Sequence, residues 1–230
     1  MYRTRTCTRS TLALLALPVV FSAAQGRPAM AAAPVGADES AVSVGSWFCS
    51  RYAEAVAAPA SSVPAAEVVS AVRSFALGYV HGVADAVGKP QVEGPSSDRR
   101  IIELLGSRCS EDPARAVRDA TLLAGRSMLE DVPPAPGKPA PDATGTLACT
   151  AYLDAPGAAE ARPSPRAGQV RNWADGYINA RFERAGRGLI PTPKNKTLML
   201  ERFATACAAT PATTVREAAR SVVDATLPGR

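Results

Sequence analysis

The chain has 230 residues, of which 20% are charged and only 5% are aromatic, and its formal net charge is +5. Three basic residues, Arg3, Arg5 and Arg9, lie close to the start, and without them 23 basic residues face 21 acidic ones. This near balance gives no reason to expect a nucleic-acid partner. Because aromatic residues are few, the sequence also predicts that covalent cross-links contribute to stability.

Residues 1–31 are predicted to be a signal peptide that is removed on export. The basic start is followed by an apolar run from Thr11 to Ala24, which is the pattern of a secretory leader. The run is shorter than the about 20 apolar residues that a membrane helix needs, and no later segment is expected to span. The mature protein is therefore predicted to be periplasmic or secreted, without a membrane span.

An internal repeat organises the rest of the sequence. The motif CSRYAEA, which starts at Cys49, corresponds to CTAYLDA, which starts at Cys149. Further on, VRSFALGYVHG corresponds to VRNWADGYINA, and in both copies 30 positions separate the motif's tyrosine, Tyr79 or Tyr177, from the next cysteine. Matching chemistry at matching spacing predicts one structural unit that is used twice.

The repeat predicts three parts in the mature chain. A first module covers residues 45–130, and a second module covers residues 147–230. The stretch 131–146 between them is rich in proline and is predicted to be a semi-rigid linker.

Each module is predicted to contain about four helices, which makes the protein all-α. A short helix surrounds the first cysteine, and Ser62 caps a long helix from Val63 to Val87 whose apolar residues recur at helical spacing. Gly88 and Gly186 are predicted to end the two long helices.

Two further helices complete each module. The third helix leads into the second cysteine of the module. The fourth is predicted to open with a capping residue followed by proline, at Asp112-Pro113 in the first module and at Thr210-Pro211 in the second.

Four cysteines remain after the leader: Cys49, Cys109, Cys149 and Cys207. An even number of cysteines in an exported protein indicates disulfides, and four cysteines allow three pairings. If each module folds by itself, Cys49 pairs with Cys109 and Cys149 pairs with Cys207. Closing such a loop is expected to stabilise a module by roughly 4 kcal/mol.

An aromatic stripe runs along the long helix of each module and contains Phe75, Tyr79, Trp173 and Tyr177. Residues of this kind at helical spacing are expected to be core. They are also the candidate partner-binding residues if the fold opens. The small residues beside them, such as Gly78, are expected to let another helix approach closely.

A basic cluster distinguishes the second module. Residues 45–130 contain 9 basic and 10 acidic residues, whereas residues 145–230 contain 12 basic and 7 acidic ones. Arg181, Arg184 and Arg187 lie near the end of the second long helix, with further lysines beyond them. The cluster is either a solvated loop or a binding surface for an anionic partner.

The sequence predicts no enzymatic activity, no metal site and no cofactor. His81 is the only histidine, its counterpart is Asn179, and it is expected to be a solvated helix residue. No serine or cysteine nucleophile has a plausible base, and the cysteines are too far apart for a metal site.

The frame of a cysteine, an aromatic–Ala–x–Gly–Tyr motif, a second cysteine and a proline resembles the HdeA/HdeB-like family of small exported helical proteins. Trp173 to Ala180 (WADGYINA) carries this likeness best. The resemblance implies a helical fold with one disulfide per module. It also implies an acid-stress chaperone, whose partners are unfolding client proteins.

A second resemblance concerns the first module. Its motif ALGYVHGVADA resembles the Rap/Tai-type immunity proteins, which neutralise toxins of type VI secretion systems. An immunity role, with a toxin as the protein partner, is therefore the alternative function. A structural protein of the envelope is a third reading.

Low pH is expected to favour opening of the modules. Once the carboxylates are protonated, the first module carries its 9 basic residues together with His81, and the second carries its 12. Repulsion among these charges favours exposure of the aromatic stripe.

Overall fold

The computed structural model describes residues 43–89, 94–131, 143–155, 164–187 and 193–227, all within one compact unit, residues 38–230. The predicted signal peptide and most of the predicted linker lie outside the described residues. Within these ranges the structure is all-α, as predicted, and strands are absent apart from two isolated bridges, Phe48–Ala116 and Ala148–Thr214.

We call residues 43–131 the N half and residues 143–227 the C half. The N half contains η2 (Val44–Ser46), α1 (Cys49–Ala57), α2 (Val63–Ala86), α3 (Pro95–Glu111) and α4 (Val117–Asp131). The C half contains η3 (Thr144–Thr146), α5 (Thr150–Leu153), α6 (Pro165–Arg184), α7 (Pro193–Ala209) and α8 (Val215–Thr226). Of the predicted linker, residues 131–146, the structure places Asp131 in α4 and Thr144–Thr146 in η3.

The first long helix begins where the sequence predicts, and both long helices end at the predicted glycines. Ser62 accepts a hydrogen bond from the Ala65 backbone at the start of α2, and Ser164 does the same for Ala167 at the start of α6. Past each C-terminal end, Gly88 and Gly186 both have φ of +70°, a conformation that favours glycine.

Both predicted disulfides are present. Cys49 is bonded to Cys109 with an S–S distance of 2.08 Å, and Cys149 is bonded to Cys207 with a distance of 2.11 Å. All four cysteines are fully buried. Each bridge joins the first helix of a half to its third helix, α1 to α3 and α5 to α7.

The predicted start of the fourth helix is wrong in both halves, since α4 begins at Val117 and α8 at Val215. The residues from Asp112 onward form a turn instead, and the carbonyls of this turn bind the start of α1. The Cys49 amide donates to the Arg115 carbonyl over 2.9 Å, and the Val117 amide donates to the Trp47 carbonyl over 2.8 Å.

The C half makes the corresponding bonds. There the Cys149 amide donates to the Thr213 carbonyl, and the Val215 amide donates to the Leu147 carbonyl, both over 2.8 Å. Helix α8 is capped by Thr214, whose side chain and that of Glu217 bond each other's backbone amides. Tertiary backbone bonds therefore override the local proline signal.

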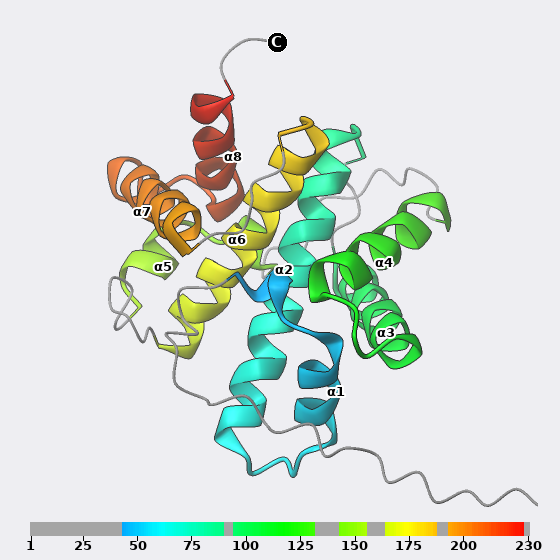
Figure 1. Cartoon of the computed structure of the whole chain (residues 1–230). Coiled ribbons are helices and arrows are strands. Elements are labelled where there is room, and N and C mark those ends of the chain that lie inside the picture. The colour runs from blue at the N-terminus through cyan, green and yellow to red at the C-terminus, as the bar shows by residue number, and fades with distance from the viewer. Residues whose placement is uncertain (1–42, 90–93, 132–142, 156–163, 188–192, 228–230) are drawn as a thin grey trace, which may run out of the picture. The chain divides into compact units, whose positions relative to one another are not determined.

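Helices α2 and α6 lie side by side at the centre (Figure 1), and each half builds its own apolar core around one of them. The cores meet, since Ala180 of α6 belongs to the N-half core and Leu77 of α2 packs on both. Seven consecutive residues of α2, Gly78 to Ala84, are buried, as expected for a helix that is covered all round.

The hydropathy of α2 differs from what the sequence analysis expects. By length and composition alone this helix is apolar enough to cross a membrane, contrary to the expectation that no segment after the leader is. The central helix of a water-soluble protein meets the same criteria, and here α2 is packed against α1, α3, α4 and α6.

Candidate functional site: the contact between the two halves

The closest approach of the halves depends on small residues. A Cβ atom on Gly78 would overlap the carbonyl of Trp173, and a Cβ on Gly176 would overlap the carbonyl of Phe75. One turn further, a Cβ on Gly82 would lie 2.7 Å from the Tyr177 carbonyl oxygen. The prediction that these glycines admit another helix is confirmed, and the other helix belongs to the opposite half.

The four candidate partner-binding aromatics, Phe75, Tyr79, Trp173 and Tyr177, are buried, each 1% exposed or less. The rings of Trp173 and Tyr177 stack with their centroids 5.2 Å apart. In each half a glycine makes room for a ring: a Cβ on Gly45 would lie 2.6 Å from Phe75, and a Cβ on Gly145 would lie 2.7 Å from Trp173. The four residues of the aromatic stripe are therefore part of the hydrophobic core in this structure.

On one side of the contact, an ion cluster surrounds the buried carboxylate of Asp85. The Tyr177 hydroxyl donates to Asp85 Oδ2 over 2.5 Å, and Asp85 is also bonded by Arg216 at 3.2 Å and Arg220 at 2.8 Å. The Asp85 side chain is 2% exposed. Burial raises the pKa of Asp85, but the Tyr177 hydrogen bond and the two arginines outweigh burial and lower it.

The other side of the contact repeats the tyrosine bond in more open surroundings. The Tyr79 hydroxyl donates to Glu183 Oε2 over 2.6 Å. The charge of Arg118 acts on both groups, but its guanidinium pairs directly with Asp119 at 3.0 Å. Burial and the bond to Glu183 raise the pKa of Tyr79, and burial and the bond to Asp85 raise that of Tyr177.

A third polar cluster surrounds Asp175 of α6, which is 4% exposed. Asp175 accepts hydrogen bonds from Ser43 of the N half and from Asn179, both over 2.8 Å. Burial raises the pKa of Asp175 even though the nearby charge of Lys196 lowers it. Acid therefore acts in opposite directions on the two aspartates: protonation removes stability at Asp85 and relieves a buried charge at Asp175.

His81 is buried, at 2% exposure, so the prediction of a solvated helix residue is wrong. Its Nε2 lies 3.3 Å from Asp98 Oδ1 of α3, and its ring lies 6.0 Å from that of Trp173. The periodicity of one helix identifies its apolar face, but it does not reveal that a second half covers the opposite face.

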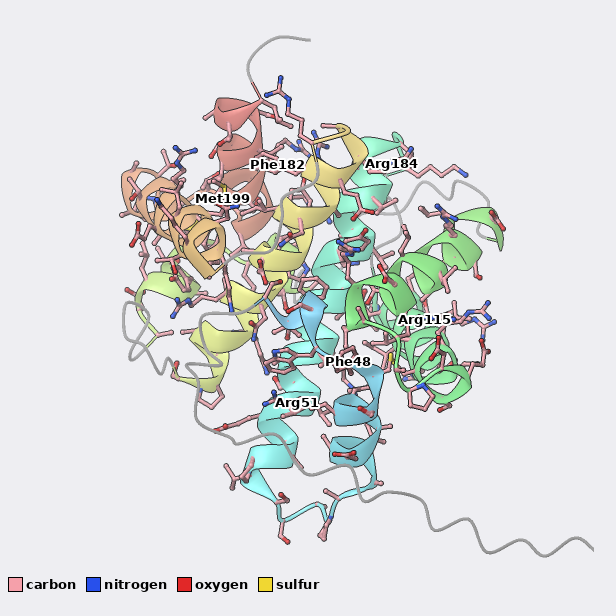
Figure 2. All side chains as sticks on the ribbon, viewed as in Figure 1. Phe48, Arg51, Arg115, Phe182, Arg184 and Met199 are labelled. Atoms are coloured by element: carbon pink, nitrogen blue, oxygen red, sulfur yellow. A yellow bond between two sulfur atoms is a disulfide. The ribbon has the colours of Figure 1, made fainter. Side chains whose placement is uncertain are left out.

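The basic cluster does not form a single site. Arg181 is half-buried, 3.9 Å from Asp224, whereas Arg184 and Arg187 are exposed. Figure 2 shows Arg184 near the end of α6. Only these two of the three candidate arginines are open to a partner.

Sequence reasoning missed the two carboxylates that bind the tyrosines. A signal existed, since Asp85 lies six positions after Tyr79 and Glu183 lies six positions after Tyr177. Among the residues that the structure describes, no group of histidines, cysteines and carboxylates could hold a metal ion.

No family model matches the chain, and neither a curated protein nor a solved structure matches it. The resemblances to the HdeA/HdeB-like and Rap/Tai-type families therefore rest on the sequence motifs.

Proposed function

We propose that the protein is a non-enzymatic, exported binding protein of the envelope that acts as an HdeA-like acid-stress chaperone. Its two halves are duplicated modules, and its partners are unfolding client proteins. The observation that carries the proposal is the contact between the halves, where two tyrosine–carboxylate bonds border buried aromatic residues. Protonation of Asp85 weakens its bond to Tyr177 together with its ion pairs to Arg216 and Arg220.

Opening at this contact supplies apolar surface for clients. Phe75, Tyr79, Trp173 and Tyr177 are buried at neutral pH and lie on the two helices that would separate. The disulfides Cys49–Cys109 and Cys149–Cys207 each stay within one half, so they do not prevent separation and they keep each half compact.

The test measures exposure and protection together. At about pH 3, below the ordinary carboxyl range, the oxidised protein is expected to bind a hydrophobic dye and to keep an acid-denatured client soluble. Near neutral pH it is expected to do neither. A native-like fold at acid pH without client protection would sink the chaperone proposal.

Variants connect this activity to the contact. The double variant Asp85→Asn with Glu183→Gln is expected to move the onset of dye binding toward neutral pH, because it removes the ion pairs of Asp85 and weakens both tyrosine bonds across the contact. Glu54→Gln is the matched control, since Glu54 is an exposed carboxylate on α1. Equal shifts in both proteins would mean that general charge repulsion, rather than the contact, controls opening.

A second candidate function is an immunity protein. The exposed Arg184 and Arg187 favour it, because they offer a charged surface to a folded toxin at neutral pH. This reading predicts tight binding of one toxin by the native protein with no acid requirement. Loss of that binding in Arg184→Ala with Arg187→Ala would support it.

A further inference from the structure

The N half carries an open groove whose lining residues take no part in the contact between the halves. Helices α1, α2 and α3 line it, and its volume is about 620 Å³. The lining is mostly apolar and includes Val56, Ile102 and the disulfide-bonded Cys109. Arg73 and Arg99 line the same groove, and both are exposed.

Neither groove arginine is paired with a carboxylate of the described residues. Arg73 Nε donates to the Tyr52 hydroxyl over 3.4 Å. Glu103, the only acidic residue in the groove lining, lies 3.7 Å from Arg100, which is outside the groove. Two arginines beside an apolar groove lining are suited to bind a ligand that has a carboxylate group and an apolar chain.

Gly106 leaves one wall of the groove open. It lies inside α3, where glycine is less favourable than alanine, yet a Cβ here would meet nothing within 4 Å. Packing inside the protein therefore does not require glycine. The C half has Ala204 at the corresponding position and Leu153 where the groove has Ala53, and both pack onto the C-half core.

We propose that this groove binds a free aliphatic carboxylate of medium chain length. The alkyl chain lies on the apolar lining and leaves water, while the carboxylate is held by Arg73 or Arg99 through charge-assisted hydrogen bonds. The site is independent of client binding, because the groove is open in the neutral state and the ligand must be ionised.

The test uses the full-length oxidised protein at neutral pH and decanoate as the probe, below its micelle-forming concentration. Calorimetry and NMR are expected to report saturable binding of one decanoate. Decanol, which lacks the charge, and decyltrimethylammonium, which reverses it, are expected to bind about tenfold more weakly or worse. Absence of saturable binding, or equal binding of all three probes, would overturn the proposal.

Variants locate the site. Gly106→Leu fills the open wall and is expected to abolish decanoate binding without lowering the melting temperature. Arg73→Gln with Arg99→Gln is expected to weaken binding about tenfold, whereas the matched control Arg100→Gln leaves it unchanged. If Arg73→Gln disturbs the fold, the single variants Arg99→Gln and Gly106→Leu still test whether decanoate binds in the groove. Unchanged binding in Gly106→Leu, or an equal loss in Arg100→Gln, would show that decanoate binds elsewhere.

Discussion

Two tyrosines make the same bond at the contact between the halves, but in different surroundings. Tyr177 donates to Asp85, which is buried and paired with two arginines, while Tyr79 donates to Glu183, which is half-buried. Arg118, the arginine near Glu183, pairs directly with Asp119 instead. The comparison teaches that one side is held by buried charge and the other by a hydrogen bond, so acid acts mainly on the Asp85 side.

The sharpest test of this difference compares two isosteric variants. Asp85→Asn removes the buried carboxylate that pairs with Arg216 and Arg220 and is expected to cost about 3–5 kcal/mol of unfolding free energy. Glu183→Gln keeps an acceptor for Tyr79 and is expected to cost about 1 kcal/mol or less. Urea denaturation at neutral pH measures both values, and equal costs would remove the distinction between the two sides.

A larger distance between α2 and α6 is expected to weaken both tyrosine–carboxylate bonds together. Gly176→Ala places a methyl group against the Phe75 carbonyl and is expected to cost about 1–3 kcal/mol. Gly106→Ala is the matched control within a helix and is expected to stabilise the protein by about 0.5–1 kcal/mol, because nothing opposes its methyl group. Thermal unfolding of both variants measures these changes in stability. An unchanged stability of Gly176→Ala would mean that α2 and α6 can move apart without cost.

The pH dependence of stability follows from the sign of the Asp85 shift. Because its folded pKa is lowered, its contribution is complete above the unfolded value of about 3.9 and is lost as pH falls through the folded pKa. Unfolding free energy is therefore expected to fall less steeply below about pH 4 in Asp85→Asn than in the natural protein. Parallel curves for the two proteins would contradict this assignment.

A small loss of stability is expected when the histidine is replaced. His81→Asn gives the N half the residue that the C half has at Asn179, and it removes the contact with Asp98. The expected cost is about 1 kcal/mol, the size of one net hydrogen bond. A loss of several kcal/mol of unfolding free energy in His81→Asn would mean that the contact between the halves depends on the imidazole and its contact with Asp98.

The sequence predicted the features that depend on local signals. The Ser62 cap, the glycine ends of the long helices and the close approach at Gly78 and Gly176 all follow from residue type and spacing. The disulfide pairing followed from the assumption that each half folds around its own cysteines.

What the sequence did not reveal depends on the contact between the halves. The burial of His81 and the partners of Tyr79 and Tyr177 come from segments about 100 positions away. Helical periodicity carries no information about such partners. The late start of α4 has a similar origin, since the turn before Val117 binds the backbone of α1.

Both halves of the contact lie on one chain, and this has a kinetic consequence. In the proposed acid opening, the separated halves stay tethered, and short linkers give effective concentrations on the order of millimolar. Closure after neutralisation is then a first-order process, equally fast in dilute and concentrated solution. Two separate subunits would reassociate more slowly on dilution, so the tether makes recovery independent of abundance.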